Sequence, residues 1–198
     1  MRLNLSYGVV TCGLIGILAA AATAVPSAQG EFPFTRERGR AAVEYRNNDI
    51  QIVAAYYYSQ RNHDSRWLMI ETAVSATQLT TIPRTAFAIR TPEGRDIPLA
   101  TQRRFGQDVE RVRLLLQNAE VTTHPVTSYF TERTWTDGMQ FFRLPFGSVV
   151  HDDFVVDDHR IVTGALFFES PTGAWEDGTY SLIVRHERGE AELPIVLD

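Results

Sequence analysis

Residues 175–184 read Trp175-Glu176-Asp177-Gly178-Thr179-Tyr180-Ser181-Leu182-Ile183-Val184. After Trp175 come two acids and a glycine, and a stretch rich in aromatic and aliphatic side chains follows. Aromatic and β-branched residues fit the pleated, half-buried surface of a strand, and glycine punctuates the chain before it. The stretch therefore predicts a turn that leads directly into a β-strand.

The same alternation of apolar runs and turn residues continues through the C-terminal half of the chain. Breaks at residues 145–147, 157–159, 171–173 and 188–189 separate the runs. The runs are Met139 to Leu144, Val149 to Val156, Ile161 to Glu169, Thr179 to His186 and Ala191 to Leu197. Short strands at this regular spacing favour a β-sandwich over a barrel with surrounding helices.

The N-terminal half predicts further strands and one helix. Apolar runs from Asp49 to Ser59 and from Trp67 to Val74 indicate two strands joined by a polar loop. A tighter hairpin is expected over residues 85–99, because Thr91-Pro92-Glu93-Gly94 supplies the fixed φ and the permissive glycine of a reverse turn. Apolar residues three and four apart predict a helix over residues 106–119.

The stretch 175–184 resembles the penultimate strand of bacterial immunoglobulin-like domains, where an acidic-Gly-x-Tyr-x-Leu pattern enters the strand. The resemblance implies that Tyr180 is a corner tyrosine, whose hydroxyl binds nearby backbone. Leu182 stands where antibody domains carry a cysteine, so the resemblance is to the disulfide-free bacterial kind. The implied fold is mostly β, an immunoglobulin-like antiparallel β-sandwich with one inserted α-helix around residues 106–119, and it implies no activity.

The N-terminus has the three parts of a signal peptide: Arg2, an uncharged run, and small residues at Ala22 and Ala24. We expect cleavage after residue 24, an N-terminal arm over 25–48 and a single domain over 49–198. The rival interpretation is an uncleaved membrane anchor over residues 7–25. Cleavage would remove Cys12, the only cysteine, and with it any disulfide or thiolate site. The mature protein is then periplasmic or secreted and has no transmembrane helix.

Charge is distributed unevenly along the chain. Residues 25–113 hold 13 arginines against 10 acids, whereas residues 114–198 hold 5 against 14. Nucleic acids and anionic membranes need a concentrated basic surface. The balance therefore argues against them as main partners and leaves a protein or an envelope polysaccharide.

The densest polar segment spans residues 151–159. Its carboxylates could supply oxygen ligands to calcium, and its histidines could add nitrogen ligands for zinc. The candidate ligands are His151, Asp152, Asp153, Asp157, Asp158 and His159. The alternative, which we favour, is that both acidic pairs decorate loops flanking one strand and keep an edge soluble, so no cofactor is expected.

Catalytic constellations are weakly indicated. A nucleophilic triad would combine Ser128 or Ser148 with His124 or His151 and an aspartate, and no Gly-x-Ser-x-Gly elbow is present. Glycoside hydrolysis would need two carboxylates drawn from Glu132, Asp137, Glu169 and Glu176. A small secreted hydrolase therefore remains only an alternative.

Two tryptophans, Trp135 and Trp175, lie at predicted turns. Their rings could stack on sugars or anchor a protein partner, or they could fold back to close an end of the core. The sequence thus favours an exported, non-catalytic β-sandwich protein that binds another protein or a cell-envelope polymer. The alternatives are a calcium- or zinc-dependent binding domain and a small hydrolase.

Overall fold

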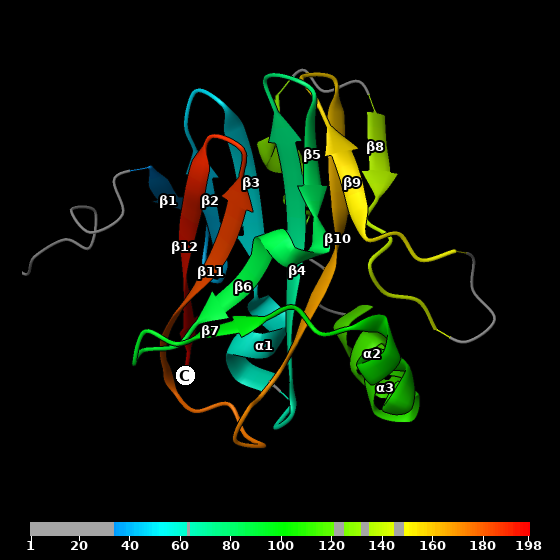
Figure 1. Ribbon diagram of the computed structural model, residues 1–198. Helices are drawn as coiled ribbons and strands as arrows, with labels where there is room; N and C mark the ends of the chain where they lie inside the picture. Colours follow the sequence, from blue (N-terminus) through cyan, green and yellow to red (C-terminus); the bar gives the residue numbers. More distant parts are fainter. Residues whose placement is uncertain (1–33, 63, 121–124, 132–134, 145–148) are drawn as a thin grey trace, which may run out of the picture.

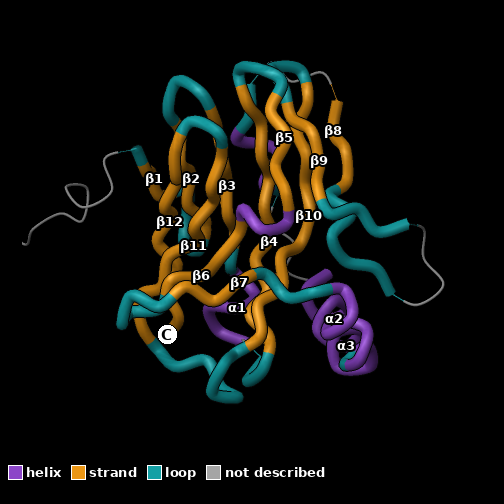
Figure 2. The backbone as a smooth tube through the Cα atoms, in the orientation of Figure 1, coloured by secondary structure: helices purple, strands orange, loops and turns teal. Residues whose placement is uncertain are grey.

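The computed structural model describes residues 34–62, 64–120, 125–131, 135–144 and 149–198 (Figure 1). These residues are mostly in β-strands, arranged in several sheets, an arrangement compatible with a β-sandwich (Figure 2). The predicted signal peptide over 1–24 and residues 25–33 of the predicted arm lie outside the described residues. Within them, no helix is both long and apolar enough to cross a bilayer.

The largest sheet has six strands. In spatial order they are β1 (Thr35–Glu37), β2 (Ala42–Arg46), β3 (Ile50–Ala55), β4 (Trp67–Ala76), β10 (Arg160–Glu169) and β8 (Trp135–Gly138). Neighbours run antiparallel except at one edge, where β8 runs parallel to β10.

Two smaller sheets complete the β structure. The four-stranded sheet has the order β12 (Gly189–Leu197), β11 (Gly178–His186), β6 (Phe87–Arg90) and β7 (Asp96–Pro98). A two-stranded sheet pairs β5 (Thr80–Pro83) with β9 (Asp153–Val156). The predicted hairpin over 85–99 is confirmed as β6 and β7, and Gly94 at its turn has a φ of 81° that favours glycine.

The principal core lies between the six-stranded sheet and the two smaller ones. Alternate residues of β4 and β10, such as Ile70 and Leu166, contribute to it from one side. Alternate residues of β11 and β12, such as Leu182 and Leu193, contribute from the other, and all four are fully buried. Because successive side chains of a strand point to opposite faces, a slip of one residue would turn these side chains away from the core.

The outer face of the six-stranded sheet is also covered. Helices α2 (Gln102–Gln107) and α3 (Val109–Glu120) pack on Trp67, Met69 and Phe167. The 3₁₀ helix η3 (Val126–Tyr129) covers a separate cluster that includes Val53. This sheet is therefore buried on both faces over much of its area.

The helical content differs from the prediction of one inserted helix. The expected helix over 106–119 is found as α3, but the helical region begins at residue 102 and α2 and α3 are separated at Asp108. Asp108 accepts hydrogen bonds from Trp67 Nε1 at 2.8 Å and Arg66 Nη1 at 3.2 Å. Burial alone would raise the pKa of Asp108, but these bonds outweigh it and the pKa is lowered.

A third helix corrects another prediction. The strand expected from Asp49 to Ser59 ends at Ala55, and α1 (Tyr57–Asn62) follows. The Ser59 hydroxyl donates to the carbonyl of Met69 at 2.6 Å and anchors α1 on β4. After Ala55 the chain therefore stops pairing as a strand, and the buried hydrogen bond of Ser59 to the β4 backbone holds it in place instead.

Three further predictions are wrong: one strand, one turn and part of the N-terminal arm. The run from Met139 to Leu144 is irregular where the structure describes it, and β8 instead occupies the residues 135–138 expected at a turn. Residues 35–46, assigned to the N-terminal arm, form β1 and β2 of the six-stranded sheet. The charge of Glu44 concealed β2, but Glu44 is 2% exposed and accepts hydrogen bonds from Arg38 Nε at 2.6 Å and Gln51 Nε2 at 2.7 Å.

Candidate functional site

Strand β8 forms one edge of the six-stranded sheet (Figure 1). Its four residues are all exposed, and Trp135 has an exposed fraction of 55%. Among the strands that the structure describes, β10 is the only neighbour of β8. The β8 edge thus combines an open row of backbone groups with a large exposed aromatic ring.

Backbone geometry decides which groups of β8 point outward. Trp135 N donates to His159 O at 3.4 Å, and Met139 N donates to Thr163 O at 2.5 Å. Because alternate residues of a parallel strand face the same neighbour, the amides and carbonyls of Thr136 and Gly138 point away from β10. These are the groups with which an added strand would pair.

A cleft of about 230 Å³ lies beside this edge, between β8 and β10 on one side and β9 on the other. Phe154 and Val162 line it with apolar surface. Its polar lining comes from Asp137, Gln140, His151, Asp153 and Arg160. The cleft therefore has an apolar component and a rim of hydrogen-bonding groups.

Arg160 is the cation of this cleft. Its Nε is buried and has no hydrogen-bond partner among the residues that the structure describes, and it lies 3.5 Å from Asp137 Oδ2 in an ion pair. A buried donor without an acceptor is costly, so a better acceptor near Arg160 would be stabilising. Arg160 is a site residue that the sequence did not single out, although it is the only basic residue within 151–160 other than histidine.

Arg84 holds the segment between β8 and β9 in place. Its guanidinium lies 4.8 Å from the ring centroid of Phe142 and donates to the carbonyls of Ala100, at 2.7 Å, and Phe141. It also contacts Asp152 Oδ1 at 3.3 Å. Burial lowers the pKa of Arg84. The negative charge of Asp152 acts in the other direction, but its effect is smaller. The connection that forms one wall of the cleft is thereby tied to the body of the domain.

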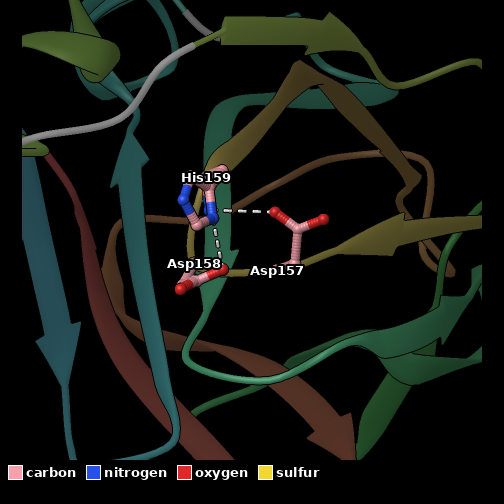
Figure 3. Close-up of side chains that lie close together, drawn as sticks. All are labelled: Asp157, Asp158 and His159. Atoms are coloured by element: carbon pink, nitrogen blue, oxygen red, sulfur yellow. Dashed lines mark hydrogen bonds and ion pairs between the residues drawn. The ribbon is translucent and has the colours of Figure 1, made fainter.

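The structure splits the six candidate metal ligands into two groups. The ligand atoms of Asp157, Asp158 and His159 lie within 4.8 Å of one another at the turn between β9 and β10 (Figure 3). His159 Nδ1 is 2.6 Å from Asp158 Oδ1, and His159 N donates to Asp157 Oδ1 at 2.9 Å.

The other three candidates, His151, Asp152 and Asp153, lie at the opposite end of β9, where His151 and Asp153 line the cleft. The two groups are separate because residues 154–156 of the extended strand β9 lie between them. Calcium or zinc binding stays a prediction, which melting with and without chelator would test.

The catalytic alternatives do not assemble among the described residues. Ser128 lies in η3 on the outer face of the six-stranded sheet, whereas His151 lines the cleft between sheets. Asp137 lines that cleft, Glu169 forms a two-point pair with Arg104 at 2.8 and 2.7 Å, and Glu176 lies in a different pocket. Ser148, His124 and Glu132 lie outside the described residues.

The two tryptophans lie in different environments. Trp135 is exposed on β8, so its ring is accessible to a partner. Partner binding by this ring stays a prediction. Trp175 is only 5% exposed, and its Nε1 donates to the carbonyl of Arg66 at 3.1 Å. Its ring closes an end of the core, which is one of the two placements expected for these tryptophans.

The β8 edge is strongly acidic. Residues 135–138 and 151–160 carry five carboxylates and one guanidinium. Comparison of the chain with models of protein families, with curated proteins and with solved structures gave no match. The function is therefore inferred from the geometry and the charge of the β8 edge.

Proposed function

We propose that this protein is an exported, non-catalytic binding domain that receives an extended, basic segment of another protein at the β8 edge. The observation that carries the proposal is the open edge of β8 beside an acidic cleft. A peptide that adds a strand to a sheet edge gains affinity from main-chain hydrogen bonds and specificity from pockets for alternate side chains. The β8 edge offers both.

The chemistry of the partner follows from charge. An added strand would place alternate side chains on the side of Asp137, above the cleft that also contains Asp153. Arginine or lysine at those positions would meet the carboxylates, and complementary charge speeds association and fixes register. Trp135 supplies an exposed aromatic ring of the kind that anchors partners in such interfaces.

Export is the second part of the proposal. It rests on Arg2, the apolar run and the small residues before the expected cleavage point after Ala24. The absence of cysteine after residue 24 fits a domain whose folding needs no disulfide. Mass spectrometry of the protein from its own cells should find a chain that begins at Val25, and an intact Met1 on cytosolic material would contradict export.

We further propose that the fold is of the immunoglobulin-like kind. The Tyr180 hydroxyl donates to the carbonyl of Glu176 at 3.0 Å, four residues upstream, which is the contact expected of a corner tyrosine. The β11–β12 hairpin follows it. The parallel pairing of β8 with β10 departs from an all-antiparallel sandwich.

The test uses a fluorescent synthetic peptide in which threonine and arginine alternate. We expect Thr136→Pro to weaken binding at least about tenfold, because proline removes the outward amide. Thr136→Ala is the matched control, since it keeps the amide and should bind as the native protein does. Asp137→Asn should also weaken binding and reduce its dependence on salt.

Two results would contradict the proposal. One is equal binding of the alternating peptide by Thr136→Pro and Thr136→Ala. The other is equal binding of a control peptide in which glutamate replaces arginine.

A further inference from the structure

A second pocket lies at the opposite end of the strands from the start of β8. Strand β10 begins at Arg160 beside Trp135 and ends at Glu169, and a strand of this length spans about 30 Å. The pocket is lined by the β6–β7 turn, the β10–β11 loop and the start of β11. Figure 1 shows these segments at the same end of the sheets. Its volume is about 380 Å³, within the range of roughly 300–1,000 Å³ typical of small-ligand sites.

The floor of this end pocket is apolar and rigid. Trp175 and Tyr180 pack edge to face with centroids 5.4 Å apart, and Ile97 lies beside them in the lining. Trp175 Nε1 donates to Arg66 O at 3.1 Å, and the Tyr180 hydroxyl donates to Glu176 O at 3.0 Å. Since these donors are already used, the rings offer the pocket mainly carbon surface that is fixed before any ligand arrives.

The rim of the end pocket is polar. Glu93, Arg95 and Glu176 are exposed side chains of the lining. Among the described residues, neither Arg95 nor Glu176 has an ion-pair partner within 4 Å. A hydrogen bond with the Thr91 side chain is the main cause of the lowered pKa of Glu93, so this carboxylate is an ionised acceptor at neutral pH.

The neighbouring surface makes this rim unusual. Asp96 follows Arg95 in sequence, and it pairs with Arg90 at 2.8 Å and with Arg185. Arg185 in turn pairs with Glu190 at 3.0 Å. Acids and arginines of the adjoining sheet face thus form ion pairs with one another. On the rim of the end pocket, Arg95 attracts the Glu93 carboxylate and helps to lower its pKa, but neither Arg95 nor Glu176 forms an ion pair within 4 Å among the described residues.

We infer that the end pocket binds an uncharged saccharide unit. Trp175 and Tyr180 are only 5% and 6% exposed, so the floor offers a small, fixed patch of carbon surface and no open stacking face. The hydroxyls of a sugar ring suit the two carboxylate acceptors and the one guanidinium donor of the rim. An anionic ligand would meet two carboxylates and a single guanidinium. A purely apolar ligand would remove water from the charged rim groups without offering them hydrogen bonds, which is unfavourable.

The experiment measures binding of neutral oligosaccharides (cello-, xylo-, manno- and malto-oligosaccharides) to the mature protein by tryptophan fluorescence and calorimetry. We expect at least one series to bind and to change the fluorescence. Glu176→Gln and Glu93→Gln should each weaken binding about tenfold, as loss of a charge-assisted hydrogen bond predicts. Glu110→Gln, on α3, is the matched control and should bind normally.

Several outcomes would overturn the inference. They are no binding by any series, binding unaffected by both rim variants, or binding of short neutral peptides with the same dependence on Glu176. Saccharide binding that persists in Thr136→Pro would separate this site from the β8 edge. Loss of peptide binding alone in that variant would leave the saccharide inference standing.

Discussion

The two main sheets present very different outer faces. On the four-stranded sheet, Arg90, Asp96, Arg185, Glu190 and Glu192 form a charged ladder at the surface, with ion-pair distances such as 2.8 Å for Arg90–Asp96. The hydrogen bond between Arg90 and Asp96 raises the pKa of Arg90 and lowers the pKa of Asp96. On the six-stranded sheet the outer face carries the apolar clusters that lie under α2, α3 and η3, and it also holds the buried side chains of Glu44 and Gln51.

The sequences of the strands explain this difference. In β12, Glu190 and Glu192 alternate with the buried Ala191 and Leu193, the pattern of a strand with one face in water. In β3 and β4 every residue except Glu71 is buried, the pattern of strands covered on both faces. A run of apolar residues without alternation therefore predicts a second covering layer, which the helices supply.

The largest expected effect is on the covered face. Phe105 is 1% exposed and packs on Phe167 with centroids 5.0 Å apart. Phe105→Ala should lower the free energy of unfolding by about 3–5 kcal/mol through lost burial and a cavity. Val196→Ala, on the exposed side of β12, should change it by less than about 0.5 kcal/mol. Denaturant unfolding measures both, and equal effects would contradict the contrast between the faces.

A smaller difference separates the ion pairs of the two faces. Arg38→Ala should cost about 2–4 kcal/mol of unfolding free energy, because it leaves the buried Glu44 carboxylate without its cation. Arg185→Ala in the charged ladder should cost less than about 1 kcal/mol, as exposed pairs usually do. A larger loss of unfolding free energy in Arg185→Ala than in Arg38→Ala would contradict this ranking of the two ion pairs.

The smallest expected effect concerns acid. Burial lowers the pKa of His186; Arg188 reinforces the shift and Asp49 opposes it. Asp49, Glu187 and Arg188 line the same small cavity as the imidazole. The unfolded chain therefore binds the proton first, and stability should fall as the pH drops from about 6.5 toward the lowered value. In His186→Gln this part of the pH profile of unfolding should flatten, and an unchanged profile would exclude His186 as its cause.

Particular residues show how far sequence reasoning reaches. The hairpin at Pro92 and Gly94 is predictable because local turn chemistry determines it. The end of β3 before α1 is not, because it depends on the contact of Ser59 with Met69, a residue ten positions away. The sequence does not predict β2, because a charged residue argues against a buried strand and only the contacts with Arg38 and Gln51 satisfy the Glu44 carboxylate there.

The candidate sites depend even more on tertiary structure. The sequence shows that segment 151–159 is polar. That β9 divides the segment, and that one end of it lies near Asp137, follows from the pairing of the strands. Trp135 and Trp175 look alike in sequence, both preceding an Asp-Gly pair. One is 55% exposed and the other 5%, because one lies on an edge strand and the other packs on Tyr180.

Amide hydrogen exchange, followed by NMR with and without the alternating threonine–arginine peptide, tests the central claim most directly. The account predicts that the outward amides of Thr136 and Gly138 exchange more slowly when the peptide is bound. Amides at the far edge, in β1, should exchange as before. Peptide binding without new protection at Thr136 and Gly138 would contradict strand addition at β8.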